Sequence, residues 1–162
     1  MASYIRIIVA DDIEPILLYL DKVLSNKYNF KIVGKAKNGR ELIDMVLSYE
    51  PEIVITDLEM PVCNGIEAIK EINKKGIKTR YVVITSNPSH ILTNEEKQLG
   101  IYKIITKPII DDKKFIEQIE AVANLKEITM RPNDEENMIE LKSNKIHKNI
   151  IIKIINKIFK SK

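Results

Sequence analysis

Five side chains that could act together in chemistry stand at the ends of short apolar segments. They are Asp11, Asp12, Asp57, Thr85 and Lys107. In α/β folds, ligands and catalytic groups gather at the carboxyl ends of the parallel strands. If the apolar segments are such strands, three carboxylates, a hydroxyl and an ammonium meet on one small surface.

This combination of groups is suited to phosphoryl transfer. At an effective dielectric near 20, each close pair of carboxylates costs about 4 kcal/mol, so a cluster of three favours a divalent cation. An oxygen-only site with room for water suits Mg²⁺. Lys107 would add a second positive charge and Thr85 a hydrogen bond, which together stabilise a transferring phosphoryl group. A carboxylate can itself be the nucleophile, forming an aspartyl phosphate.

Each feature also has a simpler reading when it is taken alone. Asp11-Asp12 after a strand is more often a helix cap or a solvated turn. Asp57 alone is an ordinary strand-end acid, Thr85 an ordinary strand residue, and Lys107-Pro108 an ordinary turn. Their occurrence at four successive strand ends favours the functional reading.

The elements that must position these residues alternate along the chain. Five β-branched runs, several nearly continuous in Ile and Val, are typical of parallel strands buried on both faces. The runs are Ile5–Ala10, Phe30–Lys35, Ile53–Asp57, Tyr81–Thr85 and Lys103–Thr106. Helices are predicted near 14–26, 40–49, 65–75, 89–99 and 111–128, the fourth having the weakest periodicity. This alternation predicts right-handed crossovers and a doubly wound α/β sheet.

Four segments of the sequence resemble the receiver domain of two-component response regulators over about residues 4–125. They are Ile7–Asp12, Ile53–Pro61 with Gly65 after it, Val82–Ser86 and Ile104–Pro108. The resemblance implies a flavodoxin-like (βα)5 sheet with strand order 2-1-3-4-5 and five flanking helices.

The same resemblance implies a role for each strand-end residue. Asp57 would accept a phosphoryl group from a histidine kinase. Thr85 would hydrogen-bond that group and move toward it on activation, and Lys107 would pair with it. The Lys107–Pro108 peptide bond is expected to be cis.

The resemblance also implies an Mg²⁺ site. Asp12 would bind the ion directly, and Asp11 would help, partly through water. Asp57 and the backbone carbonyl of Glu59 would complete the protein ligands.

One position departs from the family pattern. The family usually carries an aromatic residue three positions before the lysine, and its rotation reports phosphorylation. Here that position is Ile104, and the nearest aromatic residue, Tyr102, lies two positions earlier with the same side-chain parity. The Thr85 half of the switch is present, and either Tyr102 or Ile104 is left for the other half.

The resemblance and the charge pattern together divide the chain into a receiver domain, residues 1–128, a linker, residues 129–136, and a basic tail, residues 137–162. Seven lysines and no acid follow Glu140, so from a net charge of +3 the first 140 residues carry 3 − 7 = −4. A single cysteine, Cys63, and the lack of a secretory signal indicate a cytoplasmic protein. The apolar run Ile150–Phe159 is broken by two lysines, which is not typical of a membrane span.

The basic tail is predicted to form an extra C-terminal helix with one apolar stripe. The stripe contains Ile146, Ile150, Ile151, Ile154, Ile155, Ile158 and Phe159. Such a helix could dock on its own receiver domain or on a second copy of the chain, forming a homodimer. It could instead lie on an anionic membrane surface. Contact with nucleic acid is a third reading, although no recognition motif is visible.

The pattern as a whole favours a signalling module that acts through protein contacts rather than an enzyme with turnover on external substrates. A rival is a phosphatase of the haloacid type, which also uses a nucleophilic aspartate. That family requires D-x-D after its first strand, whereas this chain has adjacent Asp11-Asp12 followed by Ile13. A regulator that binds DNA or a membrane through the basic tail is the other alternative.

The apolar stripe generates a testable prediction about self-association. Burying about 400 Å² of apolar area would contribute roughly 10 kcal/mol at about 25 cal/mol/Å². Ordering about fifteen residues costs a comparable amount, so docking should be marginal. Replacing Ile151, Ile155 and Ile158 together by Ser should shift the protein toward monomer in sedimentation and leave phosphorylation of Asp57 intact. An unchanged profile would reject self-association through the stripe, and vesicle binding lost in the same variant would favour the membrane.

Overall fold

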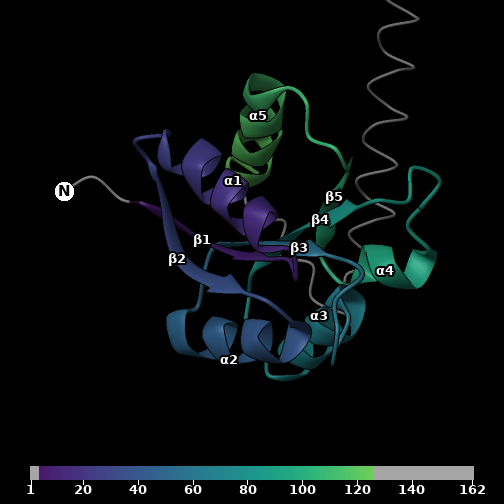
Figure 1. Cartoon of the computed structure of the whole chain (residues 1–162). Helices are drawn as coiled ribbons and strands as arrows, with labels where there is room; N and C mark the ends of the chain where they lie inside the picture. The colour runs from purple at the N-terminus through teal and green to yellow at the C-terminus, as the bar shows by residue number, and fades with distance from the viewer. Residues whose placement is uncertain (1–3, 126–162) are drawn as a thin grey trace, which may run out of the picture. The chain divides into compact units, whose positions relative to one another are not determined.

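Five parallel strands form one sheet in the computed structural model, which describes residues 4–125. The strands are β1 (Ile5–Ala10), β2 (Phe30–Ala36), β3 (Ile53–Asp57), β4 (Arg80–Thr85) and β5 (Ile101–Thr106). Their order across the sheet is β2-β1-β3-β4-β5, as predicted (Figure 1). Every residue of β3 is buried, which agrees with its continuous apolar run in the centre of the sheet.

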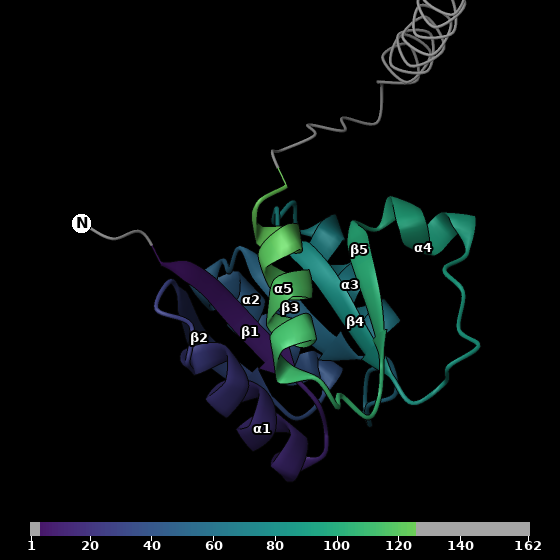
Figure 2. The same cartoon turned by 90° about the horizontal axis from the view of Figure 1, so that it is seen from above.

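Helices cover both faces of this sheet. They are α1 (Glu14–Ser25), α2 (Gly39–Tyr49), α3 (Gly65–Lys74), α4 (Asn94–Gln98) and α5 (Asp112–Ala123). Helices α1 and α5 lie on one face and α2 and α3 on the other, while α4 lies beside β5 (Figures 1 and 2). One hydrophobic core, including Leu20 and Phe115, fills the first face, and a second, including Leu42 and Ile69, fills the other. The doubly wound arrangement is therefore confirmed.

The prediction for the fourth helix was wrong in its length. A helix was expected near 89–99, but α4 covers only Asn94–Gln98 and buries no residue. Its start is fixed by a capping box in which the Thr93 hydroxyl accepts from the Glu96 N–H at 3.2 Å and the Glu96 carboxylate accepts from the Thr93 N–H at 2.8 Å. The preceding residues, which include Pro88, form the long connection from β4.

Other boundaries shift by one or two residues. Strand β2 runs on to Ala36, β4 starts at Arg80, and β5 starts at Ile101 rather than Lys103. Helix α5 ends at Ala123, and the rest of its predicted span, up to 128, lies mostly outside the described residues, as do the linker and the basic tail. Among residues 4–125, no helix has the length and apolar character needed to cross a membrane.

Candidate functional site

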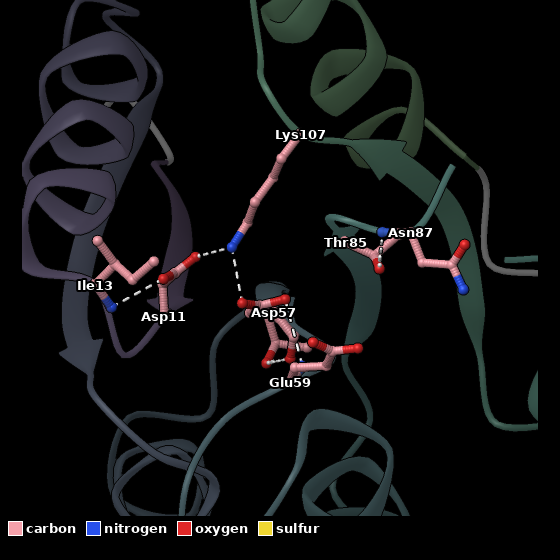
Figure 3. Close-up of polar contacts among 8 residues, drawn as sticks. Asp11, Ile13, Asp57, Glu59, Thr85, Asn87 and Lys107 are labelled. Carbon is pink, nitrogen blue, oxygen red and sulfur yellow. Dashed lines mark hydrogen bonds and ion pairs between the residues drawn. The ribbon is translucent and has the colours of Figure 1, made fainter. Parts of the chain in front are cut away.

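The five strand-end residues predicted to act together lie at the carboxyl ends of the parallel strands. Asp11 follows β1, Asp57 ends β3, Thr85 ends β4 and Lys107 follows β5 (Figure 3). Carboxylate oxygens of Asp11, Asp12 and Asp57 all lie within 4.8 Å of one another. Asp11 is fully buried and Asp57 is 6% exposed, whereas Asp12 faces solvent. The acidic cluster is thus mostly buried, and Asp12 is its solvent-exposed member.

The ammonium of Lys107 bridges two of the three carboxylates. Its Nζ donates to Asp11 Oδ2 at 2.6 Å and to Asp57 Oδ2 at 2.7 Å (Figure 3). Burial lowers the pKa of Lys107, but the hydrogen bonds to both carboxylates outweigh that effect and leave the pKa raised. The lysine therefore stays charged at neutral pH. The Lys107–Pro108 peptide bond that follows it is cis, as expected.

Asp11 is held by backbone groups on both sides. Its N–H donates to the Ala36 carbonyl of β2 at 3.0 Å, and its Oδ1 accepts from the Ile13 N–H at 3.0 Å. Burial raises the pKa of Asp11, an effect opposed by its hydrogen bonds to Lys107 and Ile13. The contact to Ile13 is an Asx turn, in which an aspartate side chain accepts from the N–H two residues later. An aspartate after a strand can signal such a turn, but this contact was not predicted.

The loop after Asp57 depends on a glycine at position 65. The Gly65 N–H donates to the Leu58 carbonyl at 2.9 Å, and a Cβ on Gly65 would lie 2.2 Å from the Asp57 carbonyl oxygen. Any side chain would therefore push α3 away from the end of β3. The Glu59 N–H lies 3.4 Å from Asp57 Oδ1 and donates to it, while the Glu59 side chain is exposed.

Thr85 lies at the end of β4, and within residues 4–125 its hydroxyl makes no hydrogen bond to the three carboxylates. It is 1% exposed, and its Oγ1 accepts from the Asn87 N–H at 3.1 Å, a contact that the sequence did not predict. Its carbonyl accepts from the Lys107 N–H at 2.8 Å. On β5, Ile104 packs partly buried against the core, whereas Tyr102 is 44% exposed. The two candidates for the second half of the switch thus differ in environment.

The donor set of the pocket fits the predicted Mg²⁺. All three clustered side chains offer oxygen, the ligand that this ion prefers, and the exposed side at Asp12 leaves room for water. Asp11, Asp12 and Asp57, with the Glu59 carbonyl, are the groups that would hold it. The charge of Lys107 alone leaves the three carboxylates incompletely neutralised, which further favours a cation.

Comparison with known proteins assigns the chain to a family. The model of the response regulator receiver domain matches residues 7–120. The chain therefore belongs to the receiver domains of two-component response regulators. Receiver domains bind Mg²⁺ at an acidic pocket, and this chain has a cluster of Asp11, Asp12 and Asp57.

Individual relatives point the same way. The chemotaxis protein CheY of Thermotoga maritima is 31% identical over 103 residues, 64% of this chain and 85% of that protein. The protein-glutamate methylesterase/protein-glutamine glutaminase of the same organism is 35% identical over 106 residues, 64% of this chain. The matched segment spans only 30% of that relative's length, and 28% for the enzyme of the same name from Treponema denticola. The solved response regulator domain of T. maritima CheB superposes with a TM-score of 0.67 at 30% identity, covering 76% of this chain and 99% of that domain.

The raised pKa of Asp11 predicts a pH dependence of stability. Without metal, the pKa of Asp11 in the folded domain lies above its ordinary value of 3.8, which is taken for the unfolded chain. The folded domain therefore binds a proton on Asp11 at a higher pH than the unfolded chain does. The stabilisation that comes from protonated Asp11 is therefore fully present below pH 3.8 and is lost as the pH rises through the folded pKa. The free energy of unfolding falls by up to about 1.4 kcal/mol per pH unit in this window. Because Asp11→Asn cannot ionise, its free energy of unfolding relative to wild type should rise across this window and then level off.

Urea unfolding at a series of pH values in EDTA measures this difference. Asp44→Asn, which removes a carboxylate at an exposed position on α2, is the matched control and should show no such rise. Parallel pH curves for wild type and Asp11→Asn would contradict the role given to burial of Asp11.

Proposed function

We propose that the chain accepts a phosphoryl group on Asp57 from a histidine kinase in a Mg²⁺-dependent reaction and relays the signal through protein contacts. The observation that carries the proposal is the pairing of Asp57 with Lys107 inside a cluster of three carboxylates. A receiver domain interacts with histidine kinases as a class property, and receiver domains often dimerise.

The residues of the pocket divide the work of the transfer. A carboxylate oxygen of Asp57 forms the new O–P bond as the P–N bond to the kinase histidine breaks, and the leaving imidazole takes up a proton. Bound Mg²⁺ would supply positive charge to the phosphoryl oxygens. Lys107, released from one carboxylate, pairs with the incoming phosphoryl group, and the Thr85 hydroxyl turns from the Asn87 N–H to hydrogen-bond it.

The proposal includes what the chain does between signals. The acyl phosphate on Asp57 forms and hydrolyses on the same molecule, so the chain is not a turnover enzyme on external substrates. The methylesterase and glutaminase activities belong to relatives most of whose length this chain does not match. A cytoplasmic location, where kinases and reducing conditions are found, fits the single buried thiol of Cys63.

The nucleophile is tested by intact-mass measurement. Incubation with acetyl phosphate and Mg²⁺ should add the mass of one phosphoryl group to wild type and none to Asp57→Asn, because an amide is too weak a nucleophile. Asp44→Asn is the charge-matched control and should label like wild type. Equal labelling of Asp57→Asn would sink the assignment, and sustained hydrolysis of phosphomonoesters beyond one equivalent would favour the haloacid-type phosphatase instead.

The metal site is tested separately by measuring how added Mg²⁺ changes the melting temperature. Asp12→Ala removes the exposed carboxylate of the cluster without opening a cavity, so the fold should persist. A loss of only about 1.4 kcal/mol weakens binding tenfold, and a carboxylate ligand should contribute at least that much to Mg²⁺ affinity. Mg²⁺ should raise the melting temperature of wild type and of Asp44→Ala far more than that of Asp12→Ala. Equal shifts in all three proteins would show that the ion binds elsewhere.

A further inference from the structure

A tyrosine on α1 joins that helix to the loop that carries Lys107. The Tyr19 hydroxyl donates to Asp112 Oδ1 at 2.5 Å, and it lies 3.4 Å from the carbonyl oxygen of Ile109, a second acceptor. Helices α1 and α5 lie on the same face of the sheet and contact each other (Figure 2). The hydroxyl therefore contacts the β5–α5 loop, residues 107–111, at Ile109, and the first residue of α5, Asp112.

This contact lies where the loop has few other restraints. At its start, the Lys107 N–H is fixed to the Thr85 carbonyl at 2.8 Å. In between, the Ile110 side chain is 89% exposed and contributes little to the core. Ile109 is partly buried against the core that Tyr19 also joins. At the far end of the loop, Asp111 caps α5 by accepting from the Lys114 N–H at 2.9 Å, and the Tyr19 hydroxyl adds a hydrogen bond from α1, which begins at Glu14.

The chemistry of the pair makes it a durable tie. A hydroxyl that donates to an ionised carboxylate forms a short, charge-assisted hydrogen bond. Burial, with the hydrogen bond and the charge of Asp112, raises the pKa of Tyr19 to about 12, so the hydroxyl keeps its proton at neutral pH. Asp112 stands in the first turn of α5, where the helix dipole favours its negative charge.

The geometry of the pocket makes the place of this loop important. Strand β5 is at the edge of the sheet, and β4 separates it from β3. The Lys107 ammonium must cross that width to lie 2.7 Å from Asp57 and 2.6 Å from Asp11. The position of the ammonium therefore depends on where the loop holds the base of the Lys107 side chain.

We propose that Tyr19 is a positioning residue: its hydroxyl fixes the β5–α5 loop against α1 and so holds Lys107 over Asp11 and Asp57. The catalytic consequence rests on the proposed phosphorylation of Asp57, whereas the structural consequence, a fixed loop, does not. The hydrogen bond also links the helix that follows Asp11, α1, to the helix that follows Lys107, α5.

One substitution tests the tie against a matched control. Tyr19→Phe keeps the ring and removes the hydroxyl. Tyr28→Phe is the control, because Tyr28 is 84% exposed and its hydroxyl makes no hydrogen bond within residues 4–125. A misplacement of about 1 Å can cost on the order of 100-fold in rate, and the loss of one hydrogen bond should displace the ammonium by less than that. Tyr19→Phe should therefore slow labelling of Asp57 by acetyl phosphate about tenfold, and Tyr28→Phe should label like wild type.

A double-mutant cycle separates positioning from general destabilisation. Asp112→Asn keeps an oxygen acceptor and should retain most of the rate, whereas Asp112→Ala should resemble Tyr19→Phe. Because both substitutions break one contact, the double variant should be no slower than either single variant. Independent, multiplied losses in the double variant would overturn the proposal.

Hydrogen exchange of the peptide covering residues 102–112 supplies a readout that does not depend on phosphorylation. The Lys107 amide, bonded to Thr85, should exchange faster in Tyr19→Phe and in Asp112→Ala, and at the wild-type rate in Tyr28→Phe. Unchanged exchange in Tyr19→Phe would overturn the positioning role even if labelling slowed. If wild type is not labelled at all, the proposed function fails, and faster exchange in Tyr19→Phe would still support the fixed loop.

Discussion

The arrangement of this domain depends on one electrostatic constraint, the crowding of three carboxylates at the end of the sheet. Asp11 and Asp57 are almost wholly buried, and their oxygens share a space under 5 Å across with those of Asp12. A single ammonium, that of Lys107, bridges the two buried ones. Removing one partner of a buried ion pair typically costs about 3–5 kcal/mol, because the other charge is left uncompensated. Loss of Lys107 with no cation in its place should therefore destabilise the domain.

The strand order explains why every part of the sheet is needed for this pairing. Strands β1 and β3 are neighbours, so the aspartates that end them are brought together directly. Lys107 arrives from the edge strand β5 and passes β4, whose last residue is Thr85. The hydroxyl of Thr85 is thus the group next to the path of the lysine, although it now accepts from Asn87.

Most of this architecture follows from local sequence, and the exceptions have physical reasons. The strands β1, β3 and β4 could be predicted as apolar runs, because helices cover both of their faces. Asp57 could be placed at a strand end because the apolar run of β3 leads up to it. Helix α4 was overestimated because it buries no side chain, so periodicity carries no information there and the capping pair Thr93 and Glu96 decides its start. Strand β5 was placed two residues late because Tyr102 is exposed at its edge. The hydrogen bond from Tyr19 to Asp112 joins residues far apart in the chain, and neither residue type signals it.

The central claim, that the carboxylate paired with Lys107 becomes an acyl phosphate, is tested most directly by locating the modified residue. Borohydride reduces an aspartyl phosphate to homoserine and leaves free aspartate unchanged, so peptide mapping after treatment with acetyl phosphate and Mg²⁺ identifies the position. The account predicts homoserine at position 57 and unmodified aspartate at positions 11 and 12. Homoserine at position 11 or 12, or a phosphoryl group that survives hydroxylamine because it is bound to a serine or threonine, would contradict it.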